Sequence, residues 1–169
     1  MFNKVFGMLT RENYVDVLTR VAVRAVISKD NKVLMIHNNK GDYKFPGGGI
    51  ETGESHQETL EREVREESGY SIQGSTCLMG SVIERRIDQL DCDRLFEMES
   101  FYYSCQIGDT QEEQMLDAYE EDLEMKPMWV TLDEAITNNE NLRHENTNHW
   151  IERELYVLKV LRDKDKDKD

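Results

Sequence analysis

Runs of apolar residues along the chain predict four strands. Residues 21–27 are mainly β-branched and residues 32–37 form a second apolar run, while the Asp-Asn pair at 30–31 supplies the residues of a turn. These two runs are therefore expected to form a hairpin. Residues 72–83 and 95–107 are rich in Tyr, Phe, Val and Ile, and they predict two longer strands.

Helix signals lie between these two pairs of strands. Ser55 is followed three residues later by Glu58, which is the spacing of a capping box. Gly69 is placed to end a helix in the left-handed conformation. Together these residues predict a helix over 56–68.

The last third of the chain repeats the pattern. A short strand is expected at 128–130, and Thr131 with Glu134 forms a second capping box that opens a short helix ending before the Asn pair at 138–139. Apolar residues then recur at helical spacing and predict a C-terminal amphipathic helix. They are Trp150, Ile151, Leu155, Leu158 and Leu161.

The remaining segments are expected to be less regular. Residues 1–19 read as a polar and aromatic extension, residues 84–94 as a charged connection, and residues 108–125 as an acidic loop. The alternating Lys-Asp tail at 163–169 is expected to be frayed and solvated. A single domain over 20–162 is then expected, with an α/β fold in which helices cover a mixed central sheet on two faces.

The charge balance limits the partners. The chain has 35 acidic and 21 basic residues, a formal net charge of −14, so its field repels a nucleic-acid backbone. A nucleic-acid partner is therefore not expected. A small phosphate-bearing ligand meets the same repulsion unless a divalent cation or local arginines offset it.

Cysteine content and hydropathy bear on the compartment. Cys77, Cys92 and Cys105 make an odd number without C-x-x-C spacing, which argues against a disulfide framework and a structural zinc site. The first residues lack the apolar run of a signal peptide, and no stretch approaches the length of a membrane span. We expect a soluble, cytoplasmic protein with no membrane partner.

The predicted helix at 56–68 gathers carboxylates. A rotation of about 100° per residue places Glu63, Glu66 and Glu67 on one side, next to the apolar line of Leu60 and Val64. Like charges at these spacings oppose helix formation by about 0.2–0.5 kcal/mol per pair unless a positive group sits against them. A solvated glutamate-rich face is the plainer interpretation of such spacing, whereas hard oxygen ligands for Mg²⁺ or Mn²⁺ are the functional one.

The surrounding residues favour the functional interpretation. Residues 48–70 read G-G-I-E-T-G-E-S-H-Q-E-T-L-E-R-E-V-R-E-E-S-G-Y. This segment resembles the Nudix box, G-x5-E-x7-R-E-U-x-E-E-x-G-U, at every fixed letter. Chance would produce such a match with a probability on the order of 10⁻⁵ in a chain of this composition. Only Tyr70 departs from the pattern, because it stands where the family usually has an aliphatic residue.

The resemblance implies a Nudix-type α/β/α sandwich and a metal-dependent hydrolase. It implies that Glu63, Glu66 and Glu67 bind the metal, Mg²⁺ or Mn²⁺, together with the backbone carbonyl of Gly47. Glu54 and Arg62 would complete the catalytic set by orienting these carboxylates. The expected reaction is cleavage of a phosphoanhydride bond in a nucleoside diphosphate linked to another group: a nucleotide, a nucleotide-sugar or a nucleoside triphosphate.

The general base stays open at this stage. In many family members it is a glutamate downstream of the box, and the chain offers several, each of which is more often a surface carboxylate. They are Glu120, Glu121 and Glu124 in the acidic segment and Glu97 and Glu99 on a predicted strand. Glu63 itself is the other alternative.

Substrate contacts are less constrained by the sequence. Arg85 and Arg86 are candidates to bind phosphates and Phe45 to stack on a base, although arginines are usually surface residues and aromatic rings usually core ones. The proline found beyond the box in many ADP-ribose hydrolases of the family is absent, since residues 84–87 read E-R-R-I. A homodimer is compatible with the resemblance.

Two other functions remain as alternatives. A catalytically silent nucleotide-sensing module would keep the fold, but such modules commonly have degraded boxes and this one is complete. An isopentenyl diphosphate isomerase has a related fold and would depend on a cysteine such as Cys92 or Cys105.

Overall fold

The computed structural model describes residues 1–144 and 148–166. Its first sheet has the order β1-β6-β7-β2. These strands are β1 (Phe2–Phe6), β6 (Tyr70–Ile87), β7 (Arg94–Gln111) and β2 (Asp16–Val26). β1 runs parallel to β6 and β2 parallel to β7, whereas β6 and β7 are antiparallel, so the sheet is mixed.

The second sheet is built around β4 (Lys32–His37), which pairs with β3 (Ser28–Lys29), β5 (Tyr43–Lys44) and β8 (Lys126–Val130). The hairpin expected between residues 21–27 and 32–37 is present only near its turn. There β3 pairs with β4 and the Leu34 amide donates to the Ile27 carbonyl at 2.9 Å, whereas residues 21–26 belong to β2 and pair with β7. Its turn residues Asp30 and Asn31 have φ angles of 50° and 63°, a left-handed conformation that Asn and Asp tolerate better than most residues.

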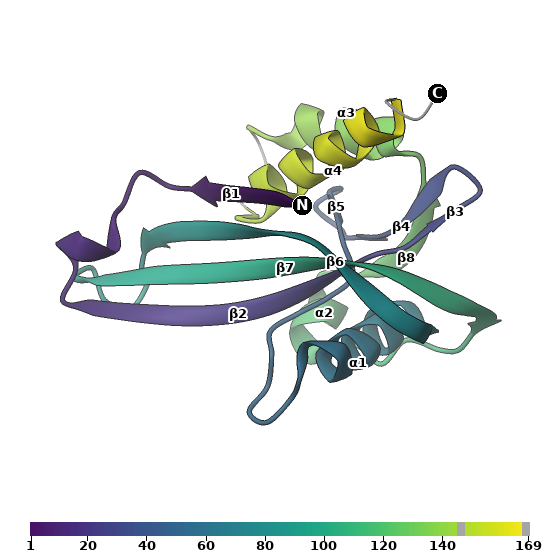
Figure 1. The fold of residues 1–169 in the computed structure, drawn as a ribbon, viewed down its shortest axis with the longest axis horizontal. Helices are drawn as coiled ribbons and strands as arrows, with labels where there is room; N and C mark the ends of the chain where they lie inside the picture. Colours follow the sequence, from purple (N-terminus) through teal and green to yellow (C-terminus); the bar gives the residue numbers. More distant parts are fainter. Residues whose placement is uncertain (145–147, 167–169) are drawn as a thin grey trace.

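Helices cover the sheets on two faces, as Figure 1 shows. α3 (Leu132–Leu142) and α4 (Ile151–Lys166) lie on one side, and α1 (His56–Ser68) with the short α2 (Ala118–Asp122) lies on the other. The expected α/β/α sandwich with a mixed central sheet is confirmed.

Each face has its own apolar core. Val23, Ala25 and Leu34 of the sheets pack with Leu60 and Val64 of α1 in one cluster. Leu60 and Val64 are fully buried, so truncating either to alanine is expected to cost about 2–5 kcal/mol. The other cluster joins the sheets to α4 and includes Val26, Phe45, Tyr102, Leu155 and Leu158.

Helix α1 has the predicted bounds. The Ser55 hydroxyl accepts from the Glu58 amide, the Glu58 carboxylate accepts from the Ser55 amide at 2.8 Å, and Gly69 ends the helix with a φ of 74°. The C-terminal capping box at Thr131 and Glu134 is formed as well. These local signals correctly placed the two helix starts.

The beginning of the chain differs from the expected extension. Residues 2–6 form β1 on the edge of the first sheet, and β2 begins at Asp16. Phe2 explains the difference, since its ring is buried and packs against Tyr102 and Tyr156. Aromatic burial therefore fixes a segment that also contains the polar residues Asn3 and Lys4.

Four further expectations require correction. The charged connection expected at 84–94 is shorter, because β6 extends to Ile87 and β7 begins at Arg94. The acidic segment at 108–125 is not a single loop, because it contains the end of β7 and the helix α2. α3 continues past its expected end because the buried Asn139 side chain exchanges hydrogen bonds of 2.9 Å with the Tyr43 backbone. α4 extends to Lys166, so residues 163–166 are helical, and residues 167–169 of the expected tail lie outside the described residues.

Candidate active site

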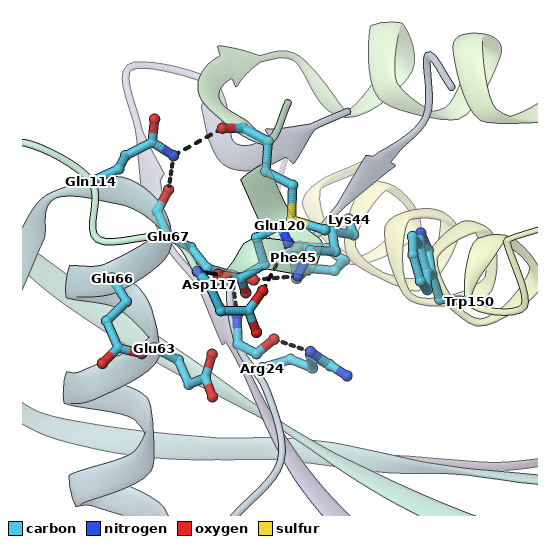
Figure 2. A network of polar contacts seen from close by, with 12 residues as sticks. Arg24, Lys44, Phe45, Glu63, Glu66, Glu67, Gln114, Asp117, Glu120 and Trp150 are labelled. Atoms are coloured by element: carbon cyan, nitrogen blue, oxygen red, sulfur yellow. Dashed lines mark hydrogen bonds and ion pairs between the residues drawn. The ribbon is translucent and has the colours of Figure 1, made fainter. Parts of the chain in front are cut away.

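Helix α1 presents its carboxylates beside the loop that follows β5. Burial of Leu60 and Val64 fixes the rotation of the helix, which leaves Glu63 and Glu67 largely covered and the Glu66 side chain 32% exposed. Figure 2 shows Glu63 and Glu67 projecting from α1 toward Glu120. The predicted clustering on one side of the helix is present.

Glu120 joins this group from α2. One carboxylate oxygen from each of Glu63, Glu67 and Glu120 lies within 4.8 Å of the others. A capping box positions Glu120, because Asp117 Oδ1 accepts from the Glu120 amide at 2.8 Å and Glu120 Oε2 accepts from the Asp117 amide at 3.0 Å. Among the alternative bases, Glu120 is thus the one from the acidic segment that the fold brings to the α1 carboxylates.

The glycines at 47 and 48 allow the loop to approach these carboxylates. The Gly47 amide donates to Glu67 Oε2 at 2.8 Å, and Gly47 has a φ of 139°. A Cβ atom on Gly47 would collide with the Val23 carbonyl, and one on Gly48 would collide with the Glu63 carboxylate. A larger residue at Gly47 would force the loop away from β2, and one at Gly48 would displace the Glu63 carboxylate of α1.

The carbonyl of Gly47, expected as a metal ligand, accepts a hydrogen bond from the Arg24 guanidinium. Burial and the nearby Arg153 lower the pKa of Arg24. A carbonyl oxygen has two lone pairs, so this contact uses one and leaves the other for a second partner. Arg24 therefore orients the carbonyl without saturating it.

Two cations contact the cluster. Lys44 forms a buried ion pair with Glu67. Arg62 binds Glu54 through two nitrogens at 2.7 and 2.8 Å, and it reaches Glu63 at 2.8 Å and Glu66 at 3.3 Å. Arg62 and Glu54 thus occupy the orienting positions that the Nudix resemblance implies.

The electrostatics indicate a shortage of positive charge. Hydrogen bonds from Arg62 lower the pKa of Glu54 to about 2, but burial and the neighbouring Glu67 raise the pKa of Glu63. Burial raises the pKa of Glu120 to about 7. The cluster is therefore poorly neutralised by the side chains around it.

A divalent cation fits this donor set. All the converging ligands are hard oxygen atoms, which suit Mg²⁺ and Mn²⁺, and the excess negative charge favours a cation. Among the described residues, neither Cys92 nor Cys105 belongs to the cluster, and Cys105 is buried with its pKa raised to about 12 by desolvation. This arrangement gives no support to the cysteine-dependent isomerase.

The candidate substrate residues fare differently. Phe45 is completely buried and packs edge-on against Tyr102, so the expectation that it stacks on a base is corrected. Arg85 and Arg86 lie near the C-terminal end of β6. Arg85 donates to Glu97 at 2.7 Å, and the Arg86 guanidinium lies 4.2 Å from the centre of the Phe96 ring, so each is engaged within the sheet.

Two polar residues of the site were not anticipated. Lys44 precedes the glycine loop directly, and this lone basic residue was the available signal. Gln114 donates to the Glu67 carbonyl at 2.6 Å and to the Met125 carbonyl at 3.0 Å, which ties the acidic segment to the end of α1 (Figure 2). Nothing in the local sequence marks Gln114.

Comparison with known proteins places these features in a family. The model of the NUDIX domain matches residues 18–152. An ADP-ribose pyrophosphatase of Methanocaldococcus jannaschii is 49% identical over 53 residues, which are 29% of this chain and 31% of that protein. The match thus spans about a third of this curated relative. No helix among the described residues is long and apolar enough to cross a membrane.

Solved structures agree on the fold. A NUDIX hydrolase from Nitrosomonas europaea has a TM-score of 0.58 and 23% identity, covering 80% of this chain and 85% of that one. A MutT NUDIX hydrolase from Burkholderia pseudomallei has a TM-score of 0.51 and 21% identity, covering 69% and 85%. The family model spans most of the described fold and the whole carboxylate helix, and the chain belongs to the NUDIX domain family.

Proposed function

We propose that this chain is a metal-dependent pyrophosphohydrolase that cleaves a phosphoanhydride bond in a nucleoside diphosphate linked to another group. The observation that carries the proposal is the convergence of Glu63, Glu67 and Glu120 beside a glycine loop, within a complete Nudix box. Membership of the NUDIX family supports it.

Glu63, Glu66, Glu67 and the Gly47 carbonyl would hold Mg²⁺ or Mn²⁺. When bound, such a cation neutralises phosphate oxygens and makes water more acidic. Arg62 orients two of these carboxylates through its contacts with Glu63 and Glu66, and Glu54 fixes Arg62 in turn. The rigid helix thereby supplies the geometry that phosphoryl chemistry requires.

Glu120 is our choice for the group that accepts the proton of the attacking water. It comes from a different element than the other carboxylates, and it is half-buried at the rim of the cluster. Its raised pKa suits proton transfer near neutral pH. Glu63 is the competing choice. A Glu120→Gln variant that, with saturating Mg²⁺, no longer shows the rise in rate with increasing pH would favour Glu120.

A nucleotide-sugar is the first substrate class to test, with ADP-ribose as its representative. The Methanocaldococcus jannaschii relative carries the name ADP-ribose pyrophosphatase, and its identity with this chain is high over the matched segment. The absence of the proline beyond the box argues for including UDP-sugars and nucleoside triphosphates in the same panel.

The test measures product masses from this panel with Mg²⁺ or Mn²⁺. We expect a nucleoside monophosphate and a phosphorylated second product, or pyrophosphate from a triphosphate. The Glu66→Gln, Glu67→Gln double variant should be inactive, whereas Glu61→Gln, which alters an exposed carboxylate of the same helix, should match the parent. Tight nucleotide binding without turnover by the parent would instead identify a silent sensing module.

A further inference from the structure

The outer edge of β2 is covered over only part of its length. The loop after β5 pairs with its second half, where the amides of Val23 and Ala25 donate to Gly48 and Pro46 at 3.0 and 2.8 Å and the Val21 carbonyl accepts from Ile50 at 3.0 Å. Within the part of the chain that the structure describes, residues 16–20 have no strand on this side. Figure 1 shows β2 as the outermost strand of this half of the sheet.

The direction of the free backbone groups follows from these pairings. The residues that bond to the loop have odd numbers, and the register of β2 with β7 is continuous from Asp16 to Val26. Backbone groups alternate between the two sides of a strand, so the N–H and C=O of Val17 and Thr19 point out from the free edge. An edge of this kind is a template for another strand.

We propose that a second copy of this chain pairs with this edge, antiparallel and about a twofold axis at Leu18. This register sets Val17 opposite Thr19 of the other copy. The outward-pointing backbone N–H and C=O of these two residues then form hydrogen bonds with each other, and the twofold axis repeats the pair. The same register sets Asp16 opposite Arg20 of the other copy, also twice. The two first sheets then form one continuous sheet.

The charges select a second copy over an unrelated strand. Asp16 has a side chain that is 66% exposed, with a contact of only 3.9 Å to Arg94, and Arg20 is exposed with no ion pair among the described residues. Shifting the register by two residues in either direction places Asp16 or Arg20 opposite an uncharged residue. Leu18, whose exposed fraction is 39%, lies on the axis and packs against Leu18 of the other copy.

The dimer would also bear on the site. A groove of 590 Å³ adjoins the free edge, and Arg20 and Thr19 line it together with Gly49, Glu51, Glu54 and His56. The start of β2 from the second copy lies beside this groove in the proposed register. Residues of the other copy therefore border the first part of the Nudix box.

Sedimentation velocity over a wide concentration range tests the proposal. The parent should dimerise, and Asp16→Arg or Arg20→Asp should each weaken the dimer by at least about tenfold, because like charges would face each other. A mixture of the two variants should restore dimers, since both facing pairs are then opposite in charge. The D16R/R20D double variant should also dimerise with itself.

Glu113→Arg is the matched control, because Glu113 is exposed and follows the end of β7, beyond the residues 94–104 of that strand that pair with β2. It should leave the dimer constant within twofold, and circular dichroism should give the same spectrum for all variants. A parent that is monomeric at every concentration would overturn the proposal. A dimer that survives Arg20→Asp, or a mixture that does not restore pairing, would equally reject this edge and register.

Discussion

Two groups of buried charges hold the loop at 45–47 from opposite faces of the sheet, and they differ in charge balance. On the α1 face, Glu67 accepts from the Gly47 amide within a cluster of four glutamates, Glu63, Glu66, Glu67 and Glu120. Lys44 and Arg62 form ion pairs with this cluster. On the α4 face, Glu154 accepts from the Phe45 amide at 3.0 Å within a network of two arginines and two glutamates.

The α4 network is internally neutral. Arg153 donates to Glu84 at 2.6 Å and to Glu154 at 2.7 Å. Arg24 interacts electrostatically with both Arg153 and Glu154. A buried pair that satisfies itself needs no further ion, whereas an excess of carboxylates does. The α4 network therefore has a structural role in holding the loop, whereas the charge imbalance of the α1 cluster supports the proposal that it binds a cation.

The largest expected effect is on activity at the unbalanced cluster. Glu67→Gln removes a carboxylate that contacts both Lys44 and the Gly47 amide, and we expect kcat to fall by about 10³-fold or more. Calorimetric titration with Mn²⁺ should show weaker uptake in parallel. Unchanged kcat would remove the α1 cluster from the chemistry.

The balanced network should respond in stability instead. Glu154→Gln leaves Arg153, which is 1% exposed, with one carboxylate partner in place of two, and we expect a loss of about 3–5 kcal/mol in the free energy of unfolding. Urea denaturation measures it. Glu152→Gln is the control, since Glu152 pairs only with the exposed Arg143 and should cost less than about 1 kcal/mol.

The contrast also explains what the sequence could predict. Helix α1 depends on neighbours in the chain, namely Ser55, Glu58 and Gly69, so its bounds and its row of carboxylates followed from local rules. Lys44, Glu120 and Glu154 meet around the loop only after the sheets have packed. In a chain with 35 acidic residues, the capping-box spacing of Asp117 and Glu120 marks a helix start, but it does not show that Glu120 meets the α1 carboxylates.

Strand β1 illustrates the same limit. Its pairing with β6 joins residues far apart in sequence, and the local hints are Phe2, Val5 and Phe6 in a short segment with no turn or capping signal. Phe45 was misjudged because an aromatic ring next to a glycine loop suits either a ligand or a core, and its burial against Tyr102 decided for the core. Whether such a ring is buried or faces a ligand depends on tertiary packing, which the local sequence does not determine.

A smaller effect is expected from the residue that orients Arg62. Glu54→Gln removes the carboxylate that two Arg62 nitrogens contact, and metal affinity should fall by about 10–100-fold. The pKa of Glu54 is about 2 when folded, below its ordinary value of 4.5. Its stabilising contribution is present above pH 4.5 and is lost as the pH falls toward 2, so the parent and the variant should converge in melting temperature in acid.

The smallest effect tests the charge shortage itself in chelator-treated protein. The pKa of Glu120 is raised from 4.5 to about 7 by burial, so the folded state holds this proton more tightly than the unfolded state. The stabilisation that comes from this tighter proton binding by Glu120 is present below pH 4.5 and is lost as the pH rises through 7. Glu120→Gln cannot ionise, so we expect it to melt a few degrees above the parent at pH 8 and near it at pH 5. Adding Mg²⁺ at pH 8 should stabilise the parent more than the variant, and an equal response of both would separate Glu120 from the metal-binding cluster.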